Sequence, residues 1–228
     1  MSATTVAYLT TDIVGSRRLL ACHPRAMRAA LVQHDTLLRA SVEGHGGRVH
    51  AHLGDGLLAV FAWPAEAVAA AVYGQRALRA ADWRPLPNLA VRMAVHTSFV
   101  KSQAGRGSEA AARQCTRLLA IGHGGQILLS EATAVDAGAQ WPAGVSVQAL
   151  GRHRLRDFAR RQRVFQVLDA SLPAEFPPLM SSWSDRWRRY ATTRALLGWC
   201  WLRRQHLRVL THAYAHPISD APLGGPSK

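Results

Sequence analysis

The spacing of hydrophobic and polar positions separates strands from helices along this chain. Residues 5–13, TVAYLTTDI, are rich in β-branched and aromatic side chains, which is typical of a buried strand. From Arg17 to about Val42, apolar residues recur at the three- and four-residue spacing of an amphipathic helix. The sequence HPR interrupts this periodicity, and EGHGG ends it with glycines. We therefore predict a strand followed by a broken helical segment.

A β-hairpin is predicted next. RVHAH and LLAVF have the composition of short strands, and LGDG joins them. Asp-Gly favours the positive φ angles that tight hairpin turns need. Residues 64–81 begin with Pro and Glu and continue with strong helix formers, so they are predicted to form a helix.

The remaining elements complete a mixed fold. Residues 88–97 alternate as a strand, 98–108 form a polar loop, and 109–121 form a helix. ILLS is a short strand, Ser130 caps a short helix after it, and two strands follow at VSVQAL and RVFQVLD. This order predicts an α+β fold of the ferredoxin-like βαββαβ type, with helices covering one face of the sheet.

The composition changes near the end of the domain. We assign residues 4–172 to the domain, 173–182 to a Pro-rich linker, and 183–228 to a Trp- and Arg-rich extension that is partly helical and disordered at its end. This extension is either an amphipathic helix that contacts an anionic membrane or a partner, or a loosely packed addition. The second interpretation is favoured, because its apolar residues occupy nearly all helix faces.

The formal charge of +14 raises the question of nucleic-acid binding. Eight basic and two acidic residues lie from 181 onward, so +6 of this charge belongs to the last fifth of the chain. No motif of the usual nucleic-acid readers is present, and we expect no nucleic-acid partner. The apolar runs are too short to span a bilayer, and the N-terminus lacks the regions of a signal peptide, so we expect a cytoplasmic protein.

Two aspartates stand at positions suited to chemistry. Asp12 ends the first strand, and Asp55 lies at the tip of the hairpin. If these strands are neighbours, both carboxylates meet at one end of the sheet, where two carboxylates and phosphate oxygens suit Mg²⁺. The small residues after Asp12 offer backbone N–H groups to an anion. Each aspartate taken alone also fits a structural role, as a turn residue or a helix cap.

Five segments of the chain form a recognisable set. They are YLTTDIVGS (8–16), HGGRVHAHLGDGLLAVF (45–61), RMAVHT (92–97), TRLLAIGHGGQILLSEAT (116–133) and LGRHRLRDFARRQRVFQVLDASLPAEFPPL (150–179). Together these segments resemble the class III adenylate/guanylate cyclase catalytic domain. The resemblance implies that Asp12 and Asp55, with Ile13, bind two Mg²⁺ or Mn²⁺ ions, and that Val14, Gly15 and Ser16 contact a nucleoside triphosphate. It further implies attack of the ribose 3′-hydroxyl on the α-phosphate, with pyrophosphate leaving.

The resemblance fails at positions that read the base and the ribose. The base-reading lysine of the family is replaced by Ala51, its partner by Arg106, and the ribose-orienting asparagine by Arg113. The arginine that stabilises the developing phosphorane charge is retained as Arg117. Neither Ala51 nor a basic side chain can accept the hydrogen bond that the amino group of adenine offers.

In the family, the metal aspartates come from one protomer and the base-reading and arginine residues from the other. We therefore expect a homodimer, or a heterodimer in which this chain supplies the metal-binding half of the site. Two alternatives stay open: a catalytically silent pseudocyclase that binds nucleotide or a partner, and a cyclase in which Arg106 and Arg113 bind another base.

Overall fold

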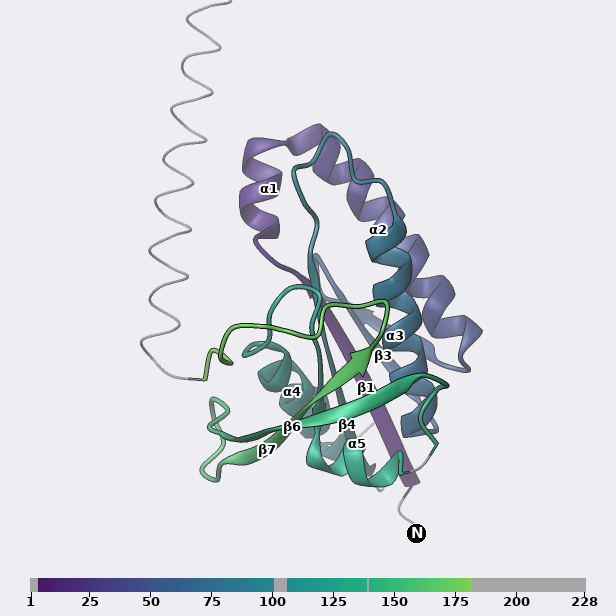
Figure 1. Ribbon diagram of the computed structural model, residues 1–228, viewed down its shortest axis with the longest axis vertical. Coiled ribbons are helices and arrows are strands. Elements are labelled where there is room, and N and C mark those ends of the chain that lie inside the picture. Colours follow the sequence, from purple (N-terminus) through teal and green to yellow (C-terminus); the bar gives the residue numbers. More distant parts are fainter. Residues whose placement is uncertain (1–3, 101–105, 139, 182–228) are drawn as a thin grey trace, which may run out of the picture.

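A computed structural model describes residues 4–100, 106–138 and 140–181. The described chain folds into one seven-stranded sheet with helices on both faces (Figure 1). The strand order is β2-β3-β1-β4-β5-β7-β6. The strands are β1 (Thr4–Ile13), β2 (Arg48–His52), β3 (Leu57–Phe61), β4 (Val91–Val100), β5 (Ile127–Ser130), β6 (Val145–His153) and β7 (Gln162–Asp169).

β1 lies inside the sheet, between β3 and β4. It pairs antiparallel with β3 on one side and, over all of its ten residues, with β4 on the other. β5 joins β4 in parallel, and β7 and β6 extend the sheet antiparallel. The first strand and the hairpin are therefore neighbours, because β3 pairs directly with β1. This is the condition under which Asp12 and Asp55 can meet at one end of the sheet.

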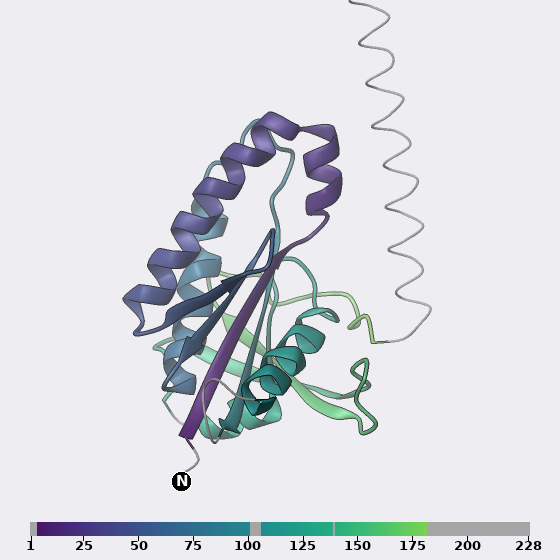
Figure 2. The same cartoon turned by 180° about the vertical axis from the view of Figure 1, so that it is seen from behind.

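The helices divide between the two faces of the sheet. They are α1 (Ser16–Cys22), α2 (Pro24–Gly44), α3 (Pro64–Ala80), α4 (Arg106–Leu119) and α5 (Glu131–Asp136). α2 and α3 lie on one face, and α4 lies on the other (Figures 1 and 2). The expectation that helices cover one face was wrong in this respect, because β1 presents apolar side chains on both of its faces.

The alternation of β1 fixes which face each of its residues occupies. Ala7, Leu9 and Ile13 are buried with α2 and α3, whereas Val6 and Tyr8 are buried in the cluster beneath α4. Successive side chains of a strand point to opposite faces, so Asp12 belongs to the α4 side. Tyr8 also links β1 to α4 through its polar group, because its hydroxyl lies 2.8 Å from Ser108 Oγ at the start of α4.

The α+β prediction is confirmed, and its boundaries moved in two places. β4 spans 91–100 rather than 88–97, because its ends follow the register with β1, from Ile13 opposite Val91 to Thr4 opposite Val100. α4 begins at Arg106, three residues before the predicted start. The break at HPR is real, since His23 separates α1 from α2. Ser130 accepts a hydrogen bond from the Thr133 amide, as its predicted capping role requires.

Residues 170–181 return across the sheet toward the end of α4. Leu179 is buried, the Met180 amide donates to the Ile121 carbonyl at 3.0 Å, and Phe176 stacks on His123. Within the described ranges, no helix is long and apolar enough to cross a membrane. The predicted extension 183–228 lies outside the described residues, so its helical character stays a prediction.

Candidate functional site

Asp12 stands at the end of β1 and is held by an arginine on the neighbouring strand. Asp12 and Arg92 are directly opposite in the antiparallel pairing of β1 and β4, so both side chains share the α4 face. Arg92 Nε donates to Asp12 Oδ2 at 2.7 Å, and its Nη2 forms an ion pair with the same oxygen. The Arg92 side chain is 17% exposed, so this pair is shielded from bulk water. Arg92 therefore fixes the orientation of the carboxylate.

The hairpin turn places Asp55 at a cavity that this pair also lines. Leu53 N donates to Gly56 O at 2.8 Å, which closes the turn. The predicted positive φ belongs to Gly54, at 87°, and not to the Asp-Gly pair itself, which corrects the sequence interpretation. Gly54 adopts this left-handed conformation because it lacks a Cβ atom.

The lack of a side chain at Gly56 allows the start of β3 to approach β1 closely. A Cβ atom at this position would lie 1.9 Å from the carbonyl oxygen of Thr11. Next to it, Leu57 N donates to Thr11 Oγ1 at 3.1 Å. The start of β3 is thus packed closely against Thr11, the residue that precedes Asp12.

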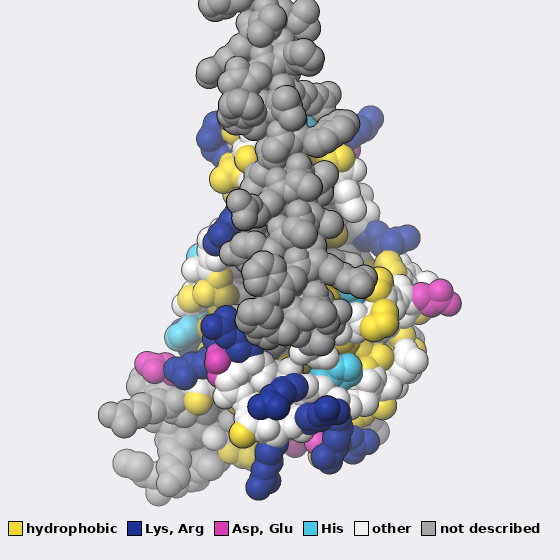
Figure 3. Space-filling view, turned by 90° about the vertical axis from the view of Figure 1, so that its left-hand side faces the viewer, with side chains coloured by type: hydrophobic (Ala, Val, Ile, Leu, Met, Phe, Trp, Pro, Cys, Tyr) yellow, Lys and Arg dark blue, Asp and Glu magenta, His cyan; other side chains and the backbone are white. Residues whose placement is uncertain are grey.

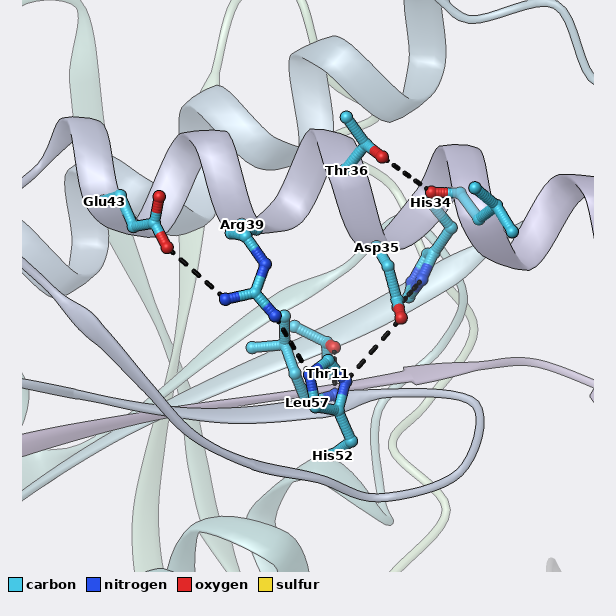
Figure 4. A network of polar contacts seen from close by, with 9 residues as sticks. Thr11, His34, Asp35, Thr36, Arg39, Glu43, His52 and Leu57 are labelled. Atoms are coloured by element: carbon cyan, nitrogen blue, oxygen red, sulfur yellow. Dashed lines mark hydrogen bonds and ion pairs between the residues drawn. The ribbon is translucent and has the colours of Figure 1, made fainter.

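The other strand of the hairpin is attached to α2 by a polar network (Figure 4). His52 lies between two α2 side chains, with Nδ1 3.6 Å from Asp35 Oδ2 and Nε2 3.1 Å from Arg39 Nη2. Asp35 Oδ1 also lies 3.2 Å from Nδ1 of the buried His34. Burial lowers the pKa of His34, so this ring is neutral near pH 7. The hairpin is therefore held from both sides.

Asp12 and Asp55 line the same cavity. It has a volume of about 570 Å³. Its lining residues are Asp12, Ile13, Gly15, Ser16, Arg17, Arg18, Leu20, Met27, Leu31, Leu53, Gly54, Asp55 and Arg92. Two carboxylates and three guanidinium groups make a cavity in which a polyanion and a divalent cation are both compatible with the charges.

The donor set fits a magnesium-type ion only in part. Among the described residues, no group of three or more His, Cys, Asp or Glu is arranged to hold a metal by itself. Two carboxylates facing a cavity nevertheless suit a hard divalent cation that takes its remaining ligands from phosphate oxygens and water. Asp12 and Asp55 fit such an ion, provided that the triphosphate arrives with it.

Of the residues that follow Asp12, Gly15 and Ser16 line the cavity. Gly15, with a φ of 72°, turns the chain from β1 into α1, and Ser16 is the first residue of that helix. Ile13 lines the cavity, and its side chain is buried toward α2 and α3. The Val14 amide donates to Ala90 O at 2.8 Å, so this N–H is already engaged.

The family-derived positions on β2 and α4 are separate from the cavity. Ala51 is half-buried against the apolar cluster beneath α4. Arg106 is the first residue of α4, and its side chain lies outside the described part. Arg113 is exposed, and Arg117 forms an ion pair with Asp157. In the described part of α4, neither Arg113 nor Arg117 lines the Asp12–Asp55 cavity.

The fold is similar to that of solved nucleotide cyclases. An adenylate cyclase of Trypanosoma brucei, described in its monomeric state, superposes with a TM-score of 0.68 at 20% identity, over 77% of this chain and 94% of that chain. The adenylyl cyclase CyaB of P. aeruginosa gives a TM-score of 0.60 at 18% identity, over 77% and 98%. A guanylate cyclase domain from Catenaria anguillulae, in complex with GTP, gives 0.59 at 14% identity, over 74% and 99%.

This chain has the fold of a nucleotidyl cyclase domain. The likeness covers nearly the whole of each solved cyclase domain, whereas identities of 14–20% leave the chemistry to be argued from the site. No protein-family model matches the sequence. Uncharacterized proteins of Mycobacterium tuberculosis and Mycobacterium bovis are 30% identical over 183 residues, or 79% of this chain. This chain spans 62% of the length of those relatives.

Sequence reasoning missed three basic residues of the cyclase-fold cavity. Arg17 and Arg18 directly follow the predicted phosphate-contacting residues, and their proximity in sequence was a usable signal. Arg92 gave no local signal, because only the register of β1 against β4 puts it opposite Asp12.

Proposed function

We propose that this domain is a nucleotidyl cyclase that converts a nucleoside triphosphate into a cyclic nucleotide and pyrophosphate. The observation that carries the proposal is that Asp12 and Asp55 line one cavity together with three arginines. This combination suits a divalent ion and a polyphosphate bound together. The nucleotide cyclases that share the fold, one of them in complex with GTP, support the same chemistry.

Each residue of the cavity has a defined task in this proposal. Asp12 and Asp55 hold Mg²⁺ or Mn²⁺, which when bound favours the attacking 3′-oxygen and neutralises the leaving pyrophosphate. Arg92 keeps the Asp12 carboxylate oriented through Oδ2. Arg17 and Arg18, on α1, line the cavity and supply positive charge for the phosphate oxygens.

The site is completed by a second chain. Arg117, which the resemblance assigns to the phosphorane, does not line the cavity of its own chain in the described structure. A homodimer, or a heterodimer with a complementary cyclase chain, brings an equivalent arginine to the cavity. Because Ala51 and Arg113 lack the base- and ribose-reading groups, a heterodimer would use the aspartates of this chain and the arginine of its partner. In a homodimer, Arg117 of each chain serves the cavity of the other.

A pseudocyclase is the second candidate, and one observation favours it. Ala51 packs on the apolar cluster beneath α4 and presents no polar group to a base. A domain with this substitution is able to bind the triphosphate end of a nucleotide without orienting its ribose. Such a protein would act through nucleotide-dependent association rather than turnover.

One assay separates these candidates. The purified protein is given Mn²⁺ with each of ATP, GTP, CTP and UTP, alone and with a complementary cyclase chain. Cyclic product that vanishes in Asp55→Ala, and persists in the exposed control Asp136→Ala, supports the cyclase. Mn²⁺-dependent triphosphate binding without product supports the pseudocyclase. Product that is unchanged in Asp55→Ala contradicts the assignment of the metal site.

A further inference from the structure

The guanidinium of Arg117 forms an ion pair with the carboxylate of Asp157, which lies far away in the sequence. Arg117 Nε donates to Asp157 Oδ2 at 2.9 Å, and Arg117 Nη2 lies 2.6 Å from the same oxygen. Arg117 is on α4, whereas Asp157 lies 40 residues later, in the turn between β6 and β7. The contact therefore depends on how this turn packs against the helix.

The turn is built to hold Asp157 in place. Leu155 is 2% exposed and belongs to the apolar cluster beneath α4, and Phe158 packs against the same cluster. The Phe158 amide donates to Leu155 O at 3.3 Å, which closes the turn around Asp157. Asp157 has a φ of 69° and is the only non-glycine residue with positive φ in the described ranges. Aspartate tolerates this left-handed conformation at modest cost, so the turn keeps its carboxylate aimed at α4.

The geometry of the pair leaves part of the guanidinium for another ligand. An arginine side chain carries five N–H donors in a planar fork. The contact to Asp157 is made from the Nε side, through Nε and Nη2. The Nη1 group and one Nη2 hydrogen point away from that side of the fork. The Arg117 side chain is 28% exposed, so it is accessible to a group outside its own chain.

The surroundings of Arg117 explain why a carboxylate is needed. The β6–β7 hairpin carries six arginines, and Lys and Arg side chains gather on this side of the molecule (Figure 3). The six arginines of the hairpin are Arg152, Arg154, Arg156, Arg160, Arg161 and Arg163. Arg156 Nε lies 3.6 Å from Asp157 Oδ1, so this carboxylate stands between two guanidinium groups. Without it, Arg117 and Arg156 would repel each other, and the long Arg117 side chain would lose its fixed orientation.

We propose that Asp157 is a positioning residue, which fixes Arg117 so that its remaining donors face the triphosphate bound in the cavity of the partner chain. This inference rests on the proposed cyclase function in its homodimeric form, in which Arg117 of each chain serves the cavity of the other. The carboxylate acts through Arg117 and does not itself touch substrate. Its effect belongs to the transition state, where a displaced arginine lowers the rate without weakening substrate binding.

A double-mutant cycle tests the proposal in the homodimer. Asp157→Asn is expected to lower kcat by about 10- to 100-fold with KM unchanged. In an Arg117→Ala background, the same substitution should change kcat by less than about 2-fold, because the residue that it positions is gone. Glu131→Gln is the matched control: Glu131 pairs with Arg163 of β7 at 3.0 Å, and both side chains are 48% exposed. It should leave kcat unchanged. An exposed pair contributes little to stability, so Tm should shift by no more than about 2–4 °C in either variant.

A second measurement separates failure of this inference from failure of the proposed function. In the full chain, the ¹⁵N resonance of Arg117 Nε should show a slowly exchanging proton that becomes fast-exchanging in Asp157→Asn, but not in Glu131→Gln. If that holds while the wild type gives no product with any nucleotide or partner, the cyclase proposal is wrong and the positioning stands. If the wild type is active and Asp157→Asn keeps its kcat, or if the Nε proton is unaffected, the positioning is wrong.

Discussion

The contact between Gly56 and β1 gives the sharpest test of how the two aspartates are brought together. A Cβ atom at Gly56 would lie 1.9 Å from Thr11 O, 2.7 Å from Thr11 C and 3.1 Å from Asp12 Cα. These neighbours are backbone atoms of β1, which is paired on both sides by β3 and β4. Since the strand cannot retreat, Gly56→Ala must push the hairpin outward and carry Asp55 with it.

The size of the effect follows from this geometry. Because real Cβ contacts begin near 3 Å, the start of β3 has to move by roughly 1 Å. Overpacking of this kind costs about 1–3 kcal/mol, and weakening the Leu57 N to Thr11 Oγ1 hydrogen bond adds about 1 kcal/mol. We expect a loss of about 3 kcal/mol in the free energy of unfolding. A displacement of this size at Asp55 should also weaken Mn²⁺-dependent triphosphate binding by about 10-fold.

The assay combines urea unfolding with titration of Mn²⁺ and nucleotide. Gly47→Ala is the matched control, because its Cβ would lie 2.1 Å from the buried ring of Phe61, away from both aspartates. It should lower stability without changing triphosphate affinity in the folded protein. If the free energy of unfolding of Gly56→Ala lies within about 0.5 kcal/mol of the wild-type value, the close approach of the hairpin to β1 is refuted. If it is destabilised but binds normally, the contact does not set the position of Asp55.

Two further predictions concern buried titratable groups. Arg76 lowers the pKa of the buried Asp169 from 3.8 to about 2, so Asp169→Asn should cost about 2 kcal/mol at pH 7. The difference in free energy of unfolding between Asp169→Asn and wild type, measured with urea, should shrink as the pH falls from 4 toward 2. A difference that stays constant over this range would contradict the ion pair. Burial lowers the pKa of His96 from 6.5 to about 4, so the unfolded chain binds more protons between these values. Acidification from pH 6.5 to 4 should therefore lower the free energy of unfolding by up to about 3 kcal/mol. If NMR shows that His96 titrates with a midpoint near pH 6.5, this prediction is refuted.

The local pattern of the sequence was sufficient for most secondary structure. The β-branched run of residues 5–13, the helical spacing around HPR and the Ser130 cap all predicted elements that the structure contains. These signals act over a few residues, so they need no knowledge of the fold. The end of β4 was misplaced because strand ends follow the register with a neighbour, which lies far away in the sequence.

The sequence by itself determined the chemical types at the candidate site. Asp12 and Asp55 lie near turns, and Arg117 and Ala51 stand at the positions that the resemblance assigns to the phosphorane and the base. Only the tertiary structure decided how they are used. It set Arg92 against Asp12 through strand register, and it pressed Gly56 onto the backbone of β1. It also paired Arg117 with Asp157 across 40 residues, apart from the cavity of its own chain. Such contacts depend on packing between distant segments, and no spacing within a single segment encodes them.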